Sequence, residues 1–122
     1  MQLTKMALTL ALAGTLFAAD ATVDKAKKQI AAKQYDEAIT ALEADYKAHP
    51  NSAEVKKTLA DAYLGKGDSM MYNDSLPPRM KYPGALKAYR QVLVYDKTNK
   101  KAQDNVNTIE GIYKSMGRPV PQ

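Results

Sequence analysis

The sequence predicts an all-α fold for one small domain. Apolar residues recur at spacings of three and four over several stretches, which is the period of an amphipathic helix. No stretch alternates between apolar and polar residues over a useful length, so strands are not expected. Glycine and proline stand between the periodic stretches, where helices should end. A chain of 122 residues has room for one core and hardly more.

The N-terminus carries the pattern of an export signal. Lys5 precedes an uncharged, largely apolar run over residues 6–17, and residues 19–21 (Ala-Asp-Ala) then resemble a signal-peptidase site. The run is too short to span a bilayer comfortably, although an N-terminal core helix or a membrane anchor is the alternative. We therefore expect residues 1–21 to be a signal peptide, removed on export to a bacterial periplasm. The mature chain has no other stretch that predicts a transmembrane segment.

The first two expected helices lie before Pro50. A short helix over residues 23–32 has few apolar residues on its inner side: Val23, Ala26 and Ile30. The second helix has a full apolar stripe, made of Tyr35, Ala38, Ile39, Leu42 and Tyr46. Pro50 then ends it, because proline cannot continue a helix.

Three more helices are expected after Pro50. Asn51 and Glu54 resemble a capping box for the third helix, and Gly65 and Gly67 mark its end. The fourth helix has Pro83 in its first turn, where proline is tolerated. A tail with two prolines, residues 117–122, follows the fifth helix. The apolar stripes of these helices are Val55, Leu59, Ala62 and Tyr63; Ala85, Leu86, Tyr89, Val92 and Leu93; and Ala102, Val106, Ile109, Tyr113 and Met116.

A short pattern occurs twice in the chain. The segment that begins Tyr35-Asp36-Glu37-Ala38-Ile39 returns as Tyr82-Pro83-Gly84-Ala85-Leu86, 47 residues further on. That separation exceeds the roughly 34 residues of a common helix-pair repeat by about 13. We therefore place an inserted loop over residues 69–81, between the two helices of the second pair.

The repeated pattern resembles that of tetratricopeptide-repeat (TPR) proteins. The residues that carry the resemblance are Leu59-Ala60, Tyr63, Gly67-Asp68, Ala85 and Tyr89, with Ala38, Leu42 and Pro50 in the repeat before. The resemblance covers nearly all of residues 22–116. It implies a right-handed stack of antiparallel helix pairs, about two and a half repeats and five helices, with the last helix as a solvent-facing cap. The first helix lacks the large residues of the family, which predicts a frayed end.

Composition excludes several kinds of chemistry. The chain has no Cys and one His, so disulfides, thiol catalysis and Cys-based zinc sites are excluded. We interpret His49 as a helix-terminal residue, because no nucleophile stands near it in a catalytic motif. The sequence has no glycine-rich phosphate loop and no calcium-loop spacing. We expect no enzyme activity, no catalytic residue, no cofactor and no metal site.

The positive charge lies in the C-terminal part. Residues 76–122 carry nine Lys and Arg against three acidic residues, whereas residues 22–75 are nearly balanced. A basic surface favours an acidic partner or an anionic envelope surface, although it also simply aids solubility. Nucleic acid is not expected, because the chain has no recognised binding motif.

The insertion is the least expected part of the sequence. It holds four hydrophobic residues that are unusual in a solvated loop: Met70, Met71, Tyr72 and Met80. Three interpretations stay open. The loop folds back on the core, it contributes these side chains to a partner surface, or its thioethers bind a soft metal such as copper(I).

The resemblance also implies a function. TPR proteins are mostly scaffolds that hold a peptide or protein segment in a concave groove, which is lined by the first helix of each repeat. The groove positions of this chain are Lys27, Ile30, Glu54, Lys57, Asp61, Leu64, Lys101, Asp104 and Thr108. We therefore expect a protein-interaction module. The alternative is a structural subunit that docks permanently into an envelope complex or a homo-oligomer.

Overall fold

The computed structural model describes residues 21–122, and in that range the chain is helical and has no strand. Residues 21–31 form the described part of the first helix. It is followed by α2 (Tyr35–Ala48), α3 (Ala53–Met71), α4 (Pro78–Tyr95) and α5 (Lys100–Ser115). The all-α prediction is confirmed for this part of the chain. The expected signal peptide, residues 1–21, lies outside the described residues except for Ala21, which is helical.

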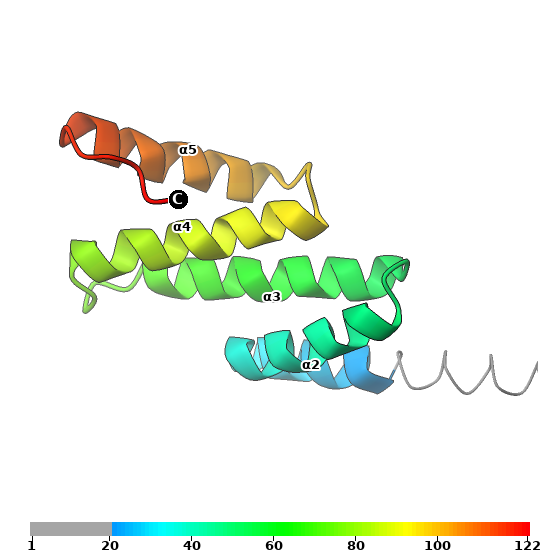
Figure 1. Cartoon of the computed structure of the whole chain (residues 1–122). Coiled ribbons are helices and arrows are strands. Elements are labelled where there is room, and N and C mark those ends of the chain that lie inside the picture. Colours follow the sequence, from blue (N-terminus) through cyan, green and yellow to red (C-terminus); the bar gives the residue numbers. More distant parts are fainter. Residues whose placement is uncertain (1–20) are drawn as a thin grey trace, which may run out of the picture.

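Successive helices run antiparallel and lie side by side (Figure 1). α3 packs against α2 on one side and against α4 on the other, and α4 packs against α5. The connections between α2, α3, α4 and α5 are short, spanning residues 49–52, 72–77 and 96–99. The described chain is therefore a repeat-like row of helices in which α3 has a central place.

Two apolar clusters fill the spaces between the helices, and α3 contributes to both. The first cluster joins the first helix, α2 and α3, and its buried members are Val23, Ala26, Ala38, Ile39, Leu42, Val55, Leu59 and Ala62. The second joins α3, α4 and α5 through Ala60, Ala85, Leu86, Tyr89, Val92, Ala102, Ile109 and Tyr113. Small residues among these let the helix axes come close, while the larger ones fill the space between pairs. The expected apolar stripes thus supply the core.

The ends of the first and last helices differ from expectation. Val23 and Ala26 are 1% and 0% exposed, so the described part of the first helix is packed into the core and does not fray. Met116, the last residue of the expected stripe, is 49% exposed. It lies outside because α5 ends at Ser115 and Gly117, with φ +65°, turns the chain back.

A side chain caps the N-terminus of α3 and of α5: Ser52 caps α3 and Asn99 caps α5. Ser52 Oγ accepts a hydrogen bond from the Val55 backbone N–H at 3.3 Å, and Asn99 Oδ1 accepts from Ala102 N–H at 3.0 Å. The expected capping residue, Asn51, is therefore wrong by one position. Ser52 has the extended backbone that a capping residue needs, whereas Asn51 belongs to the turn.

α3 continues through Gly65 and Gly67, although these glycines predict the end of the helix. A Cβ atom at Gly67 would lie 2.7 Å from the ring of Tyr89, and one at Gly65 would strike the ring of Tyr35. Both rings therefore lie directly on the backbone of α3. The glycines allow this close approach and do not stop the helix.

Just over half of the inserted segment is helical, so the expected loop over residues 69–81 is too long. α3 extends to Met71 and α4 begins at Pro78, which leaves residues 72–77 as the connection. Pro78 suits the first position of a helix because the N–H that it lacks would have no helical partner there. Pro83 then lies inside α4 and not in its first turn.

Candidate functional site

The expected groove residues come from three alternate helices: the first helix, α3 and α5. Lys27 Nζ of the first helix lies 3.3 Å from Glu54 Oε1 of α3. Lys101 Nζ of α5 lies 2.6 Å from Oδ2 of Asp68, which is also on α3. These ion pairs connect α3 to both of its alternate neighbours. We call the surface made by Lys27, Glu54, Lys57, Asp61, Asp68 and Lys101 the alternate-helix face.

The middle of this face has a mixed electrostatic field. The pKa of Asp61 is raised above its usual value, chiefly because burial penalises its charged form. The Lys57 and Lys27 ammonium groups oppose that shift, and the Asp96 carboxylate adds to it. Lys27 and Lys57 thus lie within electrostatic range of the Asp61 carboxylate.

Two expected groove residues serve the core. Ile30 is half-buried and packs against the first cluster, and Leu64 is half-buried and packs against the second. Each therefore offers only part of its side chain to a ligand.

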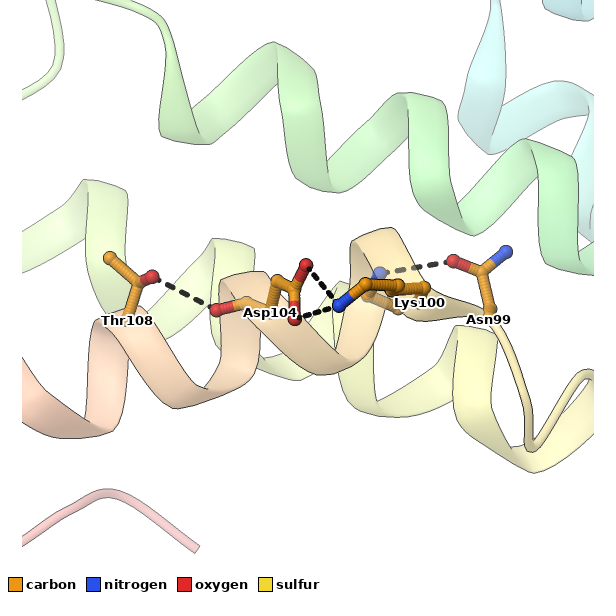
Figure 2. A network of polar contacts seen from close by, with 5 residues as sticks. Asn99, Lys100, Asp104 and Thr108 are labelled. Atoms are coloured by element: carbon orange, nitrogen blue, oxygen red, sulfur yellow. Dashed lines mark hydrogen bonds and ion pairs between the residues drawn. The ribbon is translucent and has the colours of Figure 1, made fainter.

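Asp104 and Thr108 lie along the exposed surface of α5 (Figure 2). Both oxygens of the Asp104 carboxylate are 3.2 Å from Lys100 Nζ. The Thr108 hydroxyl donates to the Asp104 carbonyl oxygen at 2.9 Å. These contacts stay within α5, so the structure does not join Asp104 and Thr108 to the other expected groove residues through a hydrogen bond or ion pair.

A three-helix polar network lies at one end of the alternate-helix face, and the sequence pattern does not predict it. The buried Tyr89 of α4 donates its hydroxyl to Asp68 Oδ1 at 2.6 Å, while Asp68 Oδ2 accepts from Lys101. Burial, and next the hydrogen bond to Asp68, raise the pKa of Tyr89. Gly65 and Gly67 predict a helix end before Asp68, so the contacts that Asp68 makes from within α3 are not predicted by the sequence.

The inserted segment divides into a packed part and an exposed part. Met70 and Met71 are half-buried at the end of α3 and pack against the second cluster. Tyr72 and Met80 are 63% and 59% exposed. Tyr72 follows Asp68 by one helical turn, and its backbone N–H donates to the Asp68 carbonyl oxygen at 3.1 Å. Tyr72 therefore extends the alternate-helix face with an exposed aromatic side chain.

A cavity of about 430 Å³ lies on the other side of α3, between α2 and α4. At 100° per residue, the α3 residues that line it point roughly opposite to Glu54, Lys57 and Asp61. Its walls are Ile39, Glu43, Tyr63, Lys66, Met70, Gly84, Lys87, Ala88 and Gln91. Internal contacts already engage part of its polar lining, because Tyr63 donates to Glu43 and Lys66 lies 2.7 Å from Asp36.

Within residues 21–122, no group of three or more His, Cys, Asp or Glu side chains is placed to hold a metal ion. None of the helices in that range is long and apolar enough to cross a bilayer. His49 Nδ1 lies 3.2 Å from Asp45 Oδ1, four residues earlier in the chain, at the end of α2. Comparison with known protein families, curated proteins and solved structures gives no match.

Proposed function

We propose that this chain is a non-enzymatic scaffold of TPR type, which binds a segment of another protein along the alternate-helix face. The supporting observation is the pair of ion pairs, Lys27 with Glu54 and Lys101 with Asp68, which join α3 to both alternate helices. In the proposed stack, each helix pair packs on the next and the first helices of the pairs line the groove. Exposed ion pairs contribute little to stability, so these side chains can exchange their partners for charges of a ligand.

The chemistry of the face favours an acidic segment with an apolar or aromatic residue near one end. Lys57 has no ion-pair partner among the described residues, and the neighbouring Lys27 is half-exposed. Tyr72 supplies an exposed aromatic surface one helical turn after Asp68, the residue that pairs with Lys101. Aromatic side chains of this kind often contribute most of the binding energy of an interface, and lysines steer an acidic partner toward it.

The proposed place of action is the bacterial periplasm, after removal of residues 1–21. The apolar run after Lys5 and the small residues at 19–21 support it. Mass spectrometry of the protein isolated from its host should give Thr22 as the first residue. A chain that retains Met1 would contradict export by this route.

The binding proposal is tested by cross-linking and pull-down from the native envelope with charge variants. We expect the variant Lys57→Glu, Lys101→Gln to lose most of the partner that the unaltered chain recovers. The control variant Lys25→Glu, Lys87→Gln changes the net charge by the same amount at two exposed lysines. At 100° per residue, Lys25 points roughly opposite to Lys27 on the first helix, and Lys87 lines the cavity on the other side of α3.

The control should recover the partner fully, with circular dichroism confirming that both variants are helical. Equal recovery by the two variants would mean that the alternate-helix face is not the binding surface. Such a result would contradict the proposal that a partner segment binds in a groove along this face.

A permanent structural subunit is the second candidate, and the exposed Tyr72 and Met80 favour it. These side chains flank the connection between α3 and α4, where a fixed interface would cover them. A complex that survives purification, and that Tyr72→Ser with Met80→Ser disrupts, would support this function. The groove charge variant should leave such a complex intact.

A further inference from the structure

We propose that the C-terminal tail, residues 117–122, is a cap that covers the junction between α4 and α5 and keeps a second copy of this chain from docking there. This inference goes beyond the proposed scaffold, because it concerns an end of the helix row and not the alternate-helix face. It follows from three observations: the turn that reverses the tail, the contacts that hold it, and the packing of α5 mainly against α4 among the described helices.

A complete helix-terminating turn sends the tail back along the molecule. Gly117 N–H donates to the Lys114 carbonyl and Arg118 N–H donates to the Tyr113 carbonyl, both at 3.0 Å. With Gly117 in the left-handed region, these two bonds make a Schellman motif. The chain after it returns beside α5 toward α4 (Figure 1). The direction of the tail is thus fixed by backbone hydrogen bonds.

Two side chains then hold the tail in place. Val120 is half-buried and packs against the second cluster. The Arg90 guanidinium of α4 donates through Nη1 to the Pro121 carbonyl at 2.7 Å, and its Nη2 lies 3.7 Å from Glu110 of α5. Arg90 therefore joins the tail, α4 and α5 at one point.

The prolines of the tail lower the entropy that is lost on docking. Pro119 and Pro121 flank Val120 and fix their own φ angles, so the free segment has fewer conformations to give up. The Pro-Val-Pro segment therefore binds the α4–α5 junction through one apolar contact and one backbone acceptor.

The position of the tail explains what it excludes. α3 and α4 each pack against a helix on either side, whereas among the described helices α5 packs mainly against α4. Without the tail, the second cluster would lose Val120 and its edge would face water. A helix row with an uncovered apolar end associates with the most complementary surface at hand, which in a pure solution is another copy of the same chain.

The test compares the unaltered chain with a chain that ends at Met116, by sedimentation velocity over a wide range of concentration. We expect the unaltered chain to stay monomeric. The shortened chain should form a dimer, and its dimer dissociation constant should be at least about tenfold lower than that of the unaltered chain. The peptide Gly117–Gln122, added in excess, should return the shortened chain to the monomer, whereas the same peptide carrying Val120→Asp should not.

Point variants decide the matter if the shortened chain does not fold. Val120→Asp should promote self-association in the intact chain. Val94→Asp, at a valine on α4 that is 59% exposed, should leave the chain monomeric. A monomeric Val120→Asp protein, or an unaltered chain that dimerises as strongly as the shortened one, would overturn the proposal.

Discussion

The Tyr89 hydroxyl on α4 and the Asp68 carboxylate on α3 lie 2.6 Å apart, in a hydrogen bond that Lys101 of α5 completes from the other side. One carboxylate thus connects three helices. Asp68 directly follows the glycine that the Tyr89 ring covers, so the polar contact and the close packing occur at the same place in α3. The network fixes α5 to α3, two helices that are not successive in the chain.

Replacing Tyr89 by phenylalanine should lower the free energy of unfolding by about 1.5–3 kcal/mol, because a hydrogen bond to a charged acceptor is lost while the ring stays over Gly67. Urea denaturation followed by circular dichroism measures the change. Tyr82→Phe is the control, since the Tyr82 hydroxyl has no hydrogen bond with the described residues; it should change the value by less than about 0.5 kcal/mol. Equal losses of unfolding free energy in both variants would mean that the hydrogen bond from Tyr89 to Asp68 does not stabilise the fold.

Stability should fall in alkaline solution. The pKa values of Tyr63, Tyr89 and Tyr95 are all raised, with burial as the largest cause; hydrogen bonds to Glu43 and Asp68 add to it for the first two. In the unfolded chain these hydroxyls ionise near the ordinary value of 10.0. Above that pH the folded chain binds more protons than the unfolded chain, so the free energy of unfolding decreases as pH rises. Below it these hydroxyls are protonated in both states, so they add no pH dependence and their stabilising contribution is fully present.

Urea denaturation at a series of alkaline pH values checks this expectation. The double variant Tyr63→Phe, Tyr89→Phe should lose stability less steeply above pH 10, since two of the responsible hydroxyls are gone. The ultraviolet absorption of tyrosinate should also show that some tyrosines of the native protein ionise only at a higher pH than the others. A double variant with an unchanged slope would assign the alkaline response to other groups.

The glycines of α3 and α5 should respond in opposite directions to alanine. Gly67→Ala places a methyl group against the Tyr89 ring and should cost about 1–3 kcal/mol of unfolding free energy, because the ring must move. Gly111→Ala is the matched control: nothing lies within 4 Å of its Cβ position, and α5 should gain about 0.5–1 kcal/mol from the better helix former. Thermal unfolding of the two variants gives the comparison, and a stabilised Gly67→Ala protein would contradict it.

Tyr95 should couple energetically to Tyr46. Their ring centroids are 5.3 Å apart and the rings are nearly perpendicular, a favourable edge arrangement between α2 and α4. A double-mutant cycle with leucine at both positions should give a coupling of about 0.5–1.5 kcal/mol. The pair Tyr46 and Tyr113, which lie in different clusters, should be additive within about 0.3–0.5 kcal/mol.

The helices and the core were predictable because both depend on a local period. The spacing of Ala38, Ile39 and Leu42 is the spacing of one helix face, and burial of such a face is the main source of helix stability in a protein. The repeat of Tyr35 and Tyr82 also indicated helix pairs. These signals remain valid whichever helices become neighbours.

The errors arose where a distant residue decides the local structure. Gly65 and Gly67 are weak helix formers, and only the rings of Tyr35 and Tyr89, far away in the chain, explain why α3 continues through them. The same continuation shortens the expected insertion loop. Of the expected groove residues, Lys27, Glu54, Lys57 and Asp61 come together, whereas the partners of Asp68 could not be predicted from its position after Gly67.

The two apolar clusters have side chains in common, and this affects how the protein unfolds. Tyr63 and Tyr95 pack against both clusters, and their rings lie parallel with centroids 6.1 Å apart. If the helices around either cluster unfolded, the other cluster would lose packing partners, including the contacts with Tyr63 and Tyr95. Heat or denaturant should therefore take the molecule apart in a single cooperative step, without a stable half-folded intermediate.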